Sequence, residues 1–215
     1  MKIHVQAFTF NPFQENTYVL YTDHADAVIV DPGCYERAEE QALIEFIAEK
    51  GLKIHALLNT HAHIDHVLGN QFVLEKFNIP YYLHPMDLPT LNSVPNYSHV
   101  YGFTNYKVSP QPTHQLAHGD VLTFGTLELE VLFTPGHAPG HVVFYNKESE
   151  IVINGDVLFS GSFGRVDLPG GDIEILKQSI HNIMFKLPDN TTVYCGHGPS
   201  TTIAKEKATN YILNF

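Results

Sequence analysis

The sequence predicts an α/β fold, arranged as a four-layer αβ/βα sandwich. Strand-like and helix-like segments alternate along the chain, and this series occurs twice. In both halves, candidate functional residues follow a predicted strand, so the two halves can present them at one shared edge. The chain has 215 residues with 44% hydrophobic content, enough to bury a sizeable core. No linker or low-complexity segment divides it, and we assign residues 1–215 to one domain.

The first series consists of short apolar strands and two helical patterns. We predict strands at residues 17–21, 27–30, 56–59 and 81–84. Residues 35–50 have apolar side chains at helical spacing, and Gly51 ends this helix. A second helical pattern starts beside Asp65, and its apolar positions are Val67, Leu68, Phe72, Val73 and Phe77.

A second series of strands and helices follows, without a sequence repeat strong enough to prove duplication. We predict strands at residues 121–124, 127–133, 142–146, 151–154 and 192–194. Helical spacing predicts one helix over residues 173–186 and a final helix over residues 202–213.

Residues 88–118 connect the two series and have a different composition. Four prolines and several asparagines predict turns and irregular backbone. The segment also contains Tyr97, Tyr101 and Tyr106. Two interpretations stay open, because these aromatic side chains could cover a substrate cleft or simply pack on the domain.

Seven histidines and aspartates in four separate places are candidate metal ligands. Four of them lie in the run 61–66, and the other three each stand beside glycine near the end of a predicted strand. Imidazole and carboxylate ligands suit zinc, iron and manganese. A set of this size fits two adjacent divalent ions rather than one closed structural site. The candidates are His61, His63, Asp65, His66, His137, Asp156 and His197.

Local geometry divides these candidates. His61 and His63 alternate along an extended segment, so both side chains can point the same way. Asp65 and His66 begin the next helical pattern and can turn toward a second ion. Asp156 has two carboxylate oxygens and can bridge the pair.

Charge and composition exclude several classes of protein. The formal net charge is −11, with 12 Lys and Arg against 23 Asp and Glu and no basic cluster, so we expect no nucleic-acid partner. The N-terminal residues lack the apolar run of a signal peptide, and no stretch reaches the roughly 20 apolar residues of a membrane span. We therefore expect a cytoplasmic protein without a membrane partner. Cys34 and Cys195 are far apart and do not indicate a disulfide scaffold.

These motifs together resemble those of the metallo-β-lactamase superfamily. The matching segments are Asp31-Pro32-Gly33, His61 to His66, Thr134 to His137, Asn154-Gly155-Asp156 and Gly196 to Pro199. The resemblance implies the αβ/βα sandwich of that superfamily as one catalytic domain. It also implies that His61, His63 and His137 hold the first metal, and that Asp156 bridges the pair. The second metal would be held by Asp65, His66 and His197.

Within the superfamily, residues 155–171 resemble the G-D-x-L-F-x-G-x-x-G-R-x-D segment of compact bacterial glyoxalase II-like hydrolases. This implies hydrolysis of S-D-lactoylglutathione or a related thioester by a metal-bridging hydroxide, with Asp65 and Asp156 as catalytic residues. It further implies two divalent ions, zinc first and iron or manganese as alternatives. Arg165 stands where relatives bind a substrate carboxylate, which favours a small anionic thioester. Its alternative role is an ion pair with Asp167.

The resemblance has a gap and leaves alternatives. The chain ends 18 residues after His197, so we expect no C-terminal glutathione-binding helical domain. A mononuclear iron persulfide dioxygenase and a lactonase stay open, whereas Asp156 in place of a cysteine disfavours a β-lactamase. Asp31 and His141 are expected to orient the ligands by hydrogen bonds, with His84 a weaker candidate for such a role. The sequence does not assign the oligomeric state.

Overall fold

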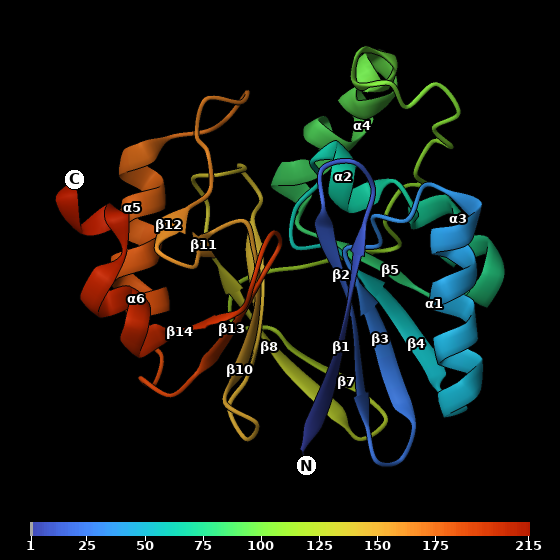
Figure 1. Ribbon diagram of the computed structural model, residues 1–215, viewed down its shortest axis with the longest axis horizontal. Helices are drawn as coiled ribbons and strands as arrows, with labels where there is room; N and C mark the ends of the chain where they lie inside the picture. The colour runs from blue at the N-terminus through green and yellow to red at the C-terminus, as the bar shows by residue number, and fades with distance from the viewer. Residues whose placement is uncertain (1) are drawn as a thin grey trace.

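Two six-stranded sheets face each other, and helices cover their outer faces (Figure 1). The computed structural model describes residues 2–215. In the first sheet the strand order is β1-β2-β3-β4-β5-β6, and in the second it is β14-β13-β10-β9-β8-β7. Helices α1 and α3 lie outside the first sheet, and α5 and α6 lie outside the second (Figure 1). The predicted four-layer αβ/βα sandwich is therefore confirmed.

The first half of the chain builds the first sheet and its helices. Its strands are β1 (Ile3–Phe10), β2 (Glu15–Thr22), β3 (Asp26–Val30), β4 (Lys53–Leu58), β5 (Tyr81–Leu83) and β6 (His114–Gln115). Its helices are α1 (Arg37–Lys50), α2 (Ile64–Val67), α3 (Asn70–Phe77) and α4 (Leu88–Tyr97), with 3-10 helices at Pro85–Asp87 and Ser98–Tyr101.

The second half builds the second sheet. Its strands are β7 (Val121–Phe124), β8 (Leu127–Phe133), β9 (Val142–Asn146), β10 (Ile151–Gly155), β13 (Thr192–Cys195) and β14 (Thr201–Thr202), and the hairpin β11 (Leu158–Phe159) and β12 (Ser162–Phe163) stands apart. Its helices are α5 (Ile173–Asn182) and α6 (Ile203–Thr209), each followed by a 3-10 helix, at Met184–Lys186 and Tyr211–Asn214.

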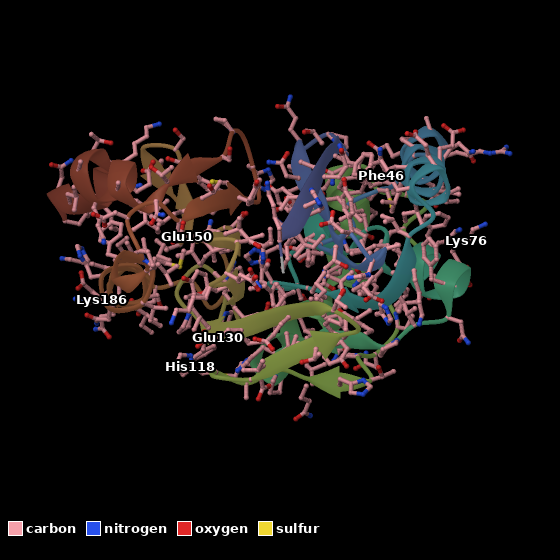
Figure 2. The ribbon with its side chains drawn as sticks, turned by 90° about the horizontal axis from the view of Figure 1, so that it is seen from below. Phe46, Lys76, His118, Glu130, Glu150 and Lys186 are labelled. Carbon is pink, nitrogen blue, oxygen red and sulfur yellow. The ribbon has the colours of Figure 1, made fainter. Side chains whose placement is uncertain are left out.

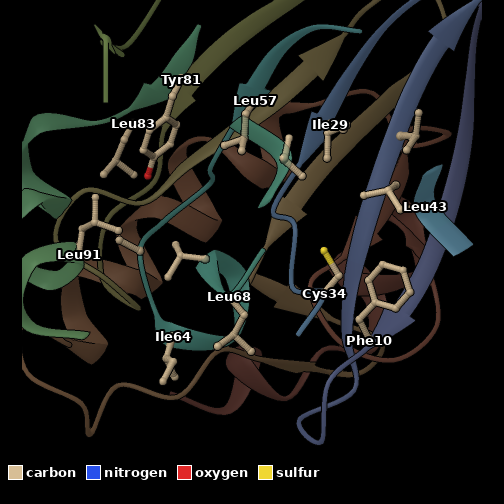
Figure 3. Packing of buried hydrophobic residues seen from close by; sticks show 14 of the residues in the cluster. Phe10, Ile29, Cys34, Leu43, Leu57, Ile64, Leu68, Tyr81, Leu83 and Leu91 are labelled. Atoms are coloured by element: carbon tan, nitrogen blue, oxygen red, sulfur yellow. The ribbon is translucent and has the colours of Figure 1, made fainter. Parts of the chain in front are cut away.

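Burial on both faces explains why the central strands are continuously apolar. On β3, Val28 and Val30 pack in the layer between the two sheets, whereas Ala27 and Ile29 pack under the outer helices. Successive side chains of a strand point to opposite faces, so a strand covered on both sides needs apolar residues at every position. Ile29 lies near Leu43 of α1 and Leu57 of β4 in the outer layer (Figure 3).

The view from below shows the same layers from the end opposite α4 (Figure 2). Lys76 of α3 and Lys186 of the 3-10 helix after α5 lie at the two outer sides, and Glu130 of β8 lies between them. No helix in the described part of the chain combines the length and the apolar character that a membrane crossing requires.

The prediction of irregular backbone over residues 88–118 was wrong at its beginning, where α4 forms. Pro89 occupies the first turn of α4, where a backbone N–H has no intrahelical acceptor to lose. Pro95 removes one hydrogen bond near the end of the helix. Packing compensates for this loss, because Leu91 and Val94 are buried against the first core layer, with Leu91 close to Leu83 (Figure 3).

Three predicted helices are shorter than their apolar patterns suggested. The first breaks near Gly69 into α2 and α3, at a point where the backbone passes so close to Cys34 that a Cβ atom would lie 2.4 Å from its sulfur. The last breaks at Asn210, whose side-chain oxygen accepts a hydrogen bond from the Ile212 N–H at 2.9 Å. The helix predicted over residues 173–186 changes to a 3-10 turn after Asn182. Strand β1 was not among the predicted strands.

A hydrogen-bonded carboxylate joins the two sheets at the end away from α4. Asp26 of β3 accepts hydrogen bonds from the Thr126 N–H at 2.8 Å, from the Thr126 hydroxyl at 2.9 Å and from His55 at 2.7 Å. Thr126 lies in the turn between β7 and β8 of the second sheet. The hydrogen bonds from Thr126, and then that from His55, lower the pKa of Asp26 from 3.8 to about 2.

We expect Asp26→Asn to lower the free energy of unfolding by about 1–2 kcal/mol at pH 7, because the amide loses charge-assisted hydrogen bonds. The depressed pKa stabilises the folded state above pH 3.8, and this contribution disappears as the pH falls toward about 2. Urea unfolding at several pH values should therefore show the two proteins converging below pH 3.8. Asp23→Asn, at an exposed position paired with His4, is the control. A difference that stays constant across this range would contradict the assignment.

Candidate metal centre

Four loops converge at one edge of the two sheets. The run His61 to His66 follows β4, His137 follows β8, Asp156 follows β10 and His197 follows β13. Strands β10 and β13 are parallel neighbours, so their carboxyl ends meet at the same place. The predicted convergence of the four segments at one edge is therefore what the structure shows.

The ligand atoms form two groups with the predicted membership. His61, His63 and His137 make up the first group, and their ligand atoms lie within 4.8 Å of one another. The Nδ1 atom of His63 lies 2.9 Å from the Nε2 atom of His137. In the second group, the Asp65 Oδ2 atom lies 3.1 Å from His197 Nε2 and 3.7 Å from His66 Nε2.

Asp156 lies between the two groups. Its Oδ2 atom is 3.5 Å from the Nε2 atoms of both His137 and His197, and its Oδ1 atom is 3.5 Å from His66 Nε2. One carboxylate therefore reaches both groups, as a bridging ligand must. Gly196 permits this approach, because a Cβ atom there would lie 2.1 Å from Asp156 Oδ1.

Unpaired polar atoms indicate that this cluster fits metal ions. His61 Nε2, His66 Nε2 and Asp156 Oδ1 are buried and have no hydrogen-bond partner within residues 2–215. Such atoms cost free energy unless something else satisfies them. All three belong to the predicted ligand set, and divalent cations bind imidazole nitrogen and carboxylate oxygen. The donor set thus fits two divalent ions of the zinc, iron or manganese type.

The first group is electrically neutral at physiological pH. Burial, followed by neighbouring imidazoles, lowers the pKa of His61 well below its usual value and that of His63 to about 3. Burial also lowers the pKa of His137. Neutral imidazole is the form that coordinates a metal, so these three side chains need not release protons to bind one.

The second group contains ionised carboxylates. Burial opposes the charge on Asp156, but His66, His137 and His197 outweigh it and lower the pKa of that carboxyl well below its usual range. His66 and His197 likewise lower the pKa of Asp65 against burial. The carboxylates in turn raise the pKa of His66, which burial alone would lower.

Asp31 positions the first ligand loop, as the sequence suggested. Its Oδ2 atom lies 3.1 Å from His66 Nδ1 and accepts a hydrogen bond from the Thr60 hydroxyl at 2.6 Å. Its Oδ1 atom accepts hydrogen bonds from the Thr60 N–H at 2.7 Å and from Asn59 at 3.2 Å. Asp31, His61 and His66 also form a close group of potential ligands. These hydrogen bonds already occupy both Asp31 oxygens, so we assign Asp31 to support rather than coordination.

His141 supports the centre from behind, also as expected. Its Nε2 atom accepts a hydrogen bond from the Asp156 N–H at 3.1 Å, and its ring stacks on His61 with 4.8 Å between centroids. His84 instead stacks on Phe133 at 4.5 Å and accepts a hydrogen bond from the Met86 N–H. Both cysteines are buried and unpaired, and Cys195 packs among the apolar residues of the second outer layer.

Asp87 is a supporting residue that the sequence reasoning missed. It is fully buried, and its two oxygens accept hydrogen bonds from the Ala62 N–H at 2.7 Å and the Gly140 N–H at 2.6 Å. Ala62 lies between His61 and His63, and Gly140 lies in the loop after His137. One carboxylate thus ties together the two loops of the first group. Asp87 stands between the predicted strand at residues 81–84 and the segment 88–118, and no motif marked it.

Glu15 and Asn16 of β2 were also missed, although they attach the first sheet to the last ligand loop. The Asn16 amide donates to the carbonyls of Cys195 at 3.0 Å and Gly198 at 2.8 Å, on either side of His197. Glu15 is fully buried, accepts a hydrogen bond from the Thr17 hydroxyl and has its Oε1 atom 3.9 Å from His66 Nδ1. Burial raises its pKa well above the usual value.

Arg165 makes the ion pair that was its alternative role. Its Nε and one terminal nitrogen donate to the two Asp167 oxygens at 2.7 Å each, and both side chains are largely exposed. The main-chain carbonyl of Arg165 lies 2.7 Å from His137 Nδ1 and accepts a hydrogen bond from the Nδ1–H, a tautomer that leaves Nε2 free as a ligand atom. Binding of a substrate by the guanidinium stays a prediction.

A cavity of about 1120 Å³ opens onto the centre. Its lining includes His63, Asp65, His137, Asp156 and His197, so members of both groups face the same space. Parts of α4, the following 3-10 helix and the β11–β12 hairpin form its sides. The first of the two interpretations of residues 88–118 is supported for Tyr97 and Tyr101, which line the cavity, whereas Tyr106 packs against the first core layer as in the second interpretation.

Known proteins are similar to this chain in both sequence and fold. A family model described as the metallo-beta-lactamase superfamily matches residues 10–197. A Bacillus subtilis protein named probable metallo-hydrolase YqgX is 42% identical, with 94% of each chain covered. The protein named hydroxyacylglutathione hydrolase GloC from Haemophilus influenzae is 33% identical, with 99% of each chain covered.

Two solved structures have the same architecture. One is described as the BLEG-1 B3 metallo-beta-lactamase, with a TM-score of 0.89 and 39% identity over 99% of this chain and 100% of the other. The second is TTHA1623 in a di-iron-bound form, with a TM-score of 0.86 and 40% identity over 96% of this chain and 99% of the other.

We expect Asp87→Asn to weaken metal binding by about ten- to a hundredfold, the range for partners that orient ligands. The amide oxygen can accept from only one of the two N–H groups, so one ligand loop loses its anchor. Zinc affinity measured by competition with a chromogenic chelator tests this. Asp189→Asn, an exposed position paired with Lys207, is the matched control. Equal affinities in Asp87→Asn and the wild type would refute the positioning role.

Proposed function

The chain belongs to the metallo-β-lactamase superfamily and is a metallo-hydrolase, and we propose from this membership that it hydrolyses thioesters in the manner of glyoxalase II. The observation that carries the proposal is the pair of ligand groups joined by Asp156, with unpaired ligand atoms directed into one centre. We propose S-D-lactoylglutathione as the first substrate to test.

The side chains of this centre would bind two metal ions. His61, His63 and His137 would hold one ion and Asp65, His66 and His197 the other, with Asp156 shared. Two divalent ions so held would lower the pKa of a bound water and polarise a carbonyl.

The carboxylates and the scaffold would supply the remaining functions. Asp65 and Asp156 line the cavity as carboxylates, so they can accept a hydrogen bond from the attacking water and orient it. The Arg165 carbonyl keeps His137 in one tautomer.

The imidazole and carboxylate donors support zinc as the first metal to consider, with iron or manganese as alternatives. The solved neighbour in a di-iron-bound form gives iron specific weight. Metal content therefore has to be measured together with activity.

Support for thioesters comes from the relative named hydroxyacylglutathione hydrolase GloC, which aligns with nearly the whole chain. A small-molecule substrate is consistent with the cavity, whose volume lies near the upper end of ordinary ligand sites. The neighbour described as a B3 metallo-beta-lactamase makes β-lactam hydrolysis the competing activity. Both use the same attack on a polarised carbonyl, so a penicillin should be assayed in parallel.

We expect purified, metal-loaded protein to hydrolyse S-D-lactoylglutathione, and Asp156→Ala to reduce turnover by more than about a hundredfold, since a direct ligand matters more than the partners that orient ligands. Metal content determined on the same samples should fall in the variant, with the circular dichroism spectrum unchanged. Full activity with normal metal content in Asp156→Ala would contradict the bridging role. No thioester turnover by fully metallated protein would reject the proposed activity, and oxygen uptake with glutathione persulfide would then identify a dioxygenase.

Arg165→Ala should raise KM for an anionic thioester by about three- to fivefold with little change in kcat, because an exposed charge contributes about 1 kcal/mol to uniform binding. Asp167→Asn is the matched variant, since it releases the guanidinium from its ion pair and should lower KM. Unchanged KM values in both variants would leave Arg165 with only the ion pair.

A further inference from the structure

The walls of the cavity differ in character from its floor. The floor consists of the imidazole and carboxylate groups of the metal centre, and most of the other lining side chains are apolar. A reacting carbonyl has to lie at the floor, within reach of Asp65 and Asp156. The group attached to that carbonyl then extends along the walls.

One wall is a preassembled group of aromatic rings. Phe13 of the β1–β2 turn packs edge-on against Tyr101, with 5.6 Å between ring centroids, and Tyr101 packs against Tyr97 at 5.9 Å. Behind them, Phe13 contacts Phe103 at 5.8 Å. Phe13 and Tyr101 remain 40% and 49% exposed, so each ring keeps a free face.

The opposite wall comes from the β11–β12 hairpin and the loop that follows it. Phe159, Phe163, Leu168 and Pro169 line the cavity from this side. Phe159 packs edge-on against His197 at 6.0 Å, so the apolar wall begins directly at the metal centre. Figure 1 shows α4 and this hairpin on either side of the sheet edge that carries the ligands.

Two more apolar groups complete the mouth. Met86 and Val100 line the cavity and are 52% and 71% exposed. Together with Phe13 and Tyr101 they place four exposed large apolar side chains around one opening. A concentration of this kind on a protein surface marks a binding site. Met86 is flexible and polarisable, which suits contact with ligands of variable shape.

The walls of the cavity, apart from the metal centre, carry little charge that could pair with an ionic ligand. Arg165 is the only lysine or arginine among the described residues of the lining, and Asp167 already neutralises it. A peptide thiol such as glutathione carries two carboxylates, for which these walls offer no further cation. Away from the metal centre and Arg165, contact between the walls and a substrate is therefore mainly apolar.

We propose that the preferred substrates are thioesters of an extended apolar acyl group, an aliphatic chain of medium length or an aryl group, held between the aromatic wall and the β11–β12 wall. This inference rests on the proposed thioesterase activity and specifies its substrate class. In the reaction the acyl C–S bond breaks, the oxygen of water forms the new C–O bond, and the products are the carboxylate and the free thiol. A three-carbon lactoyl group would leave most of the walls without contact.

Binding tests the inference independently of hydrolysis. S-Methylglutathione and S-hexylglutathione share one charged carrier and contain a thioether that cannot be hydrolysed. We expect S-hexylglutathione to bind the metal-loaded protein at least about tenfold more tightly by isothermal titration calorimetry, because each buried methylene contributes favourably. Equal affinities would overturn the inference, whatever the protein hydrolyses.

Hydrolysis of a matched series gives the second measurement. Acetyl, butanoyl, hexanoyl and octanoyl thioesters of glutathione should show kcat/KM rising by about two- to fourfold per methylene until the cavity is filled. The hexanoyl thioester should also exceed S-D-lactoylglutathione. A flat or falling series with measurable turnover would overturn the acyl preference and leave the thioesterase activity standing. No turnover of any thioester would overturn both.

The variant Tyr101→Ala tests whether the aromatic wall binds the acyl group of the substrate. Tyr101 lies in the wall, and its ring packs on Phe13 and Tyr97. The variant should lower the ratio of hexanoyl to acetyl kcat/KM by about three- to tenfold, the share expected for part of an apolar contact. Val121→Ala, at an exposed apolar position on β7, should preserve the ratio. An unchanged ratio in Tyr101→Ala would overturn the assignment of this wall.

Discussion

The close approach of several imidazole and carboxylate groups at one edge of two sheets is the constraint on which the rest of this structure depends. Groups of this kind repel one another or lose hydration when they are buried together, so they persist only where the surrounding backbone holds them. In this protein the backbone is held by other buried polar groups. Asp31 fixes the loop that begins at Thr60, Asp87 joins that loop to the one after β8, and Asn16 holds the loop around His197. Each of these anchors belongs to a different element from the loop that it fixes.

These anchors explain why a sandwich of two sheets is needed. The first sheet supplies the loop with four candidate ligands, and the second supplies one ligand from each of three strand ends. Neither sheet supplies a complete ligand group by itself. The loop of the first sheet needs His137 to complete the first group and His197 to complete the second, and both residues follow strands of the second sheet. The apolar layer between the sheets sets their separation, and the Asp26 link secures the far end. The ligand atoms then lie within a few ångströms of one another, because the packing of the two sheets fixes where their strand ends lie.

The cavity adds selectivity to a centre whose chemistry is general. Two metal ions and a carboxylate can promote attack on thioesters, lactones and β-lactams alike, because each presents a carbonyl to the same nucleophile. The choice among them must come from the walls, which are built by α4, the β1–β2 turn and the β11–β12 hairpin. The helix α4 is anchored to the core by Leu91, as Figure 3 shows, so Tyr97 at its end is presented from a stable support. One similar protein is named as a hydroxyacylglutathione hydrolase and another is described as a metallo-beta-lactamase. This agrees with a general hydrolytic centre whose substrate is chosen by the cavity walls.

The sequence by itself determined the αβ/βα fold class, most of the central strands and helices, and the candidate ligands that the structure brings together. Those features depend on local periodicity and on residue types at short spacing, such as His61, His63 and His66, which a single segment contains. It misjudged α4, because its prolines suggested irregular backbone while burial of Leu91 and Val94 stabilised a helix. Only the tertiary structure showed that Asp87 and Asn16 also hold the ligand loops, and which residues line the cavity. The contacts of Asp87 and Phe13 join segments far apart in the chain, and no local pattern records a contact that exists only when the two sheets have packed together.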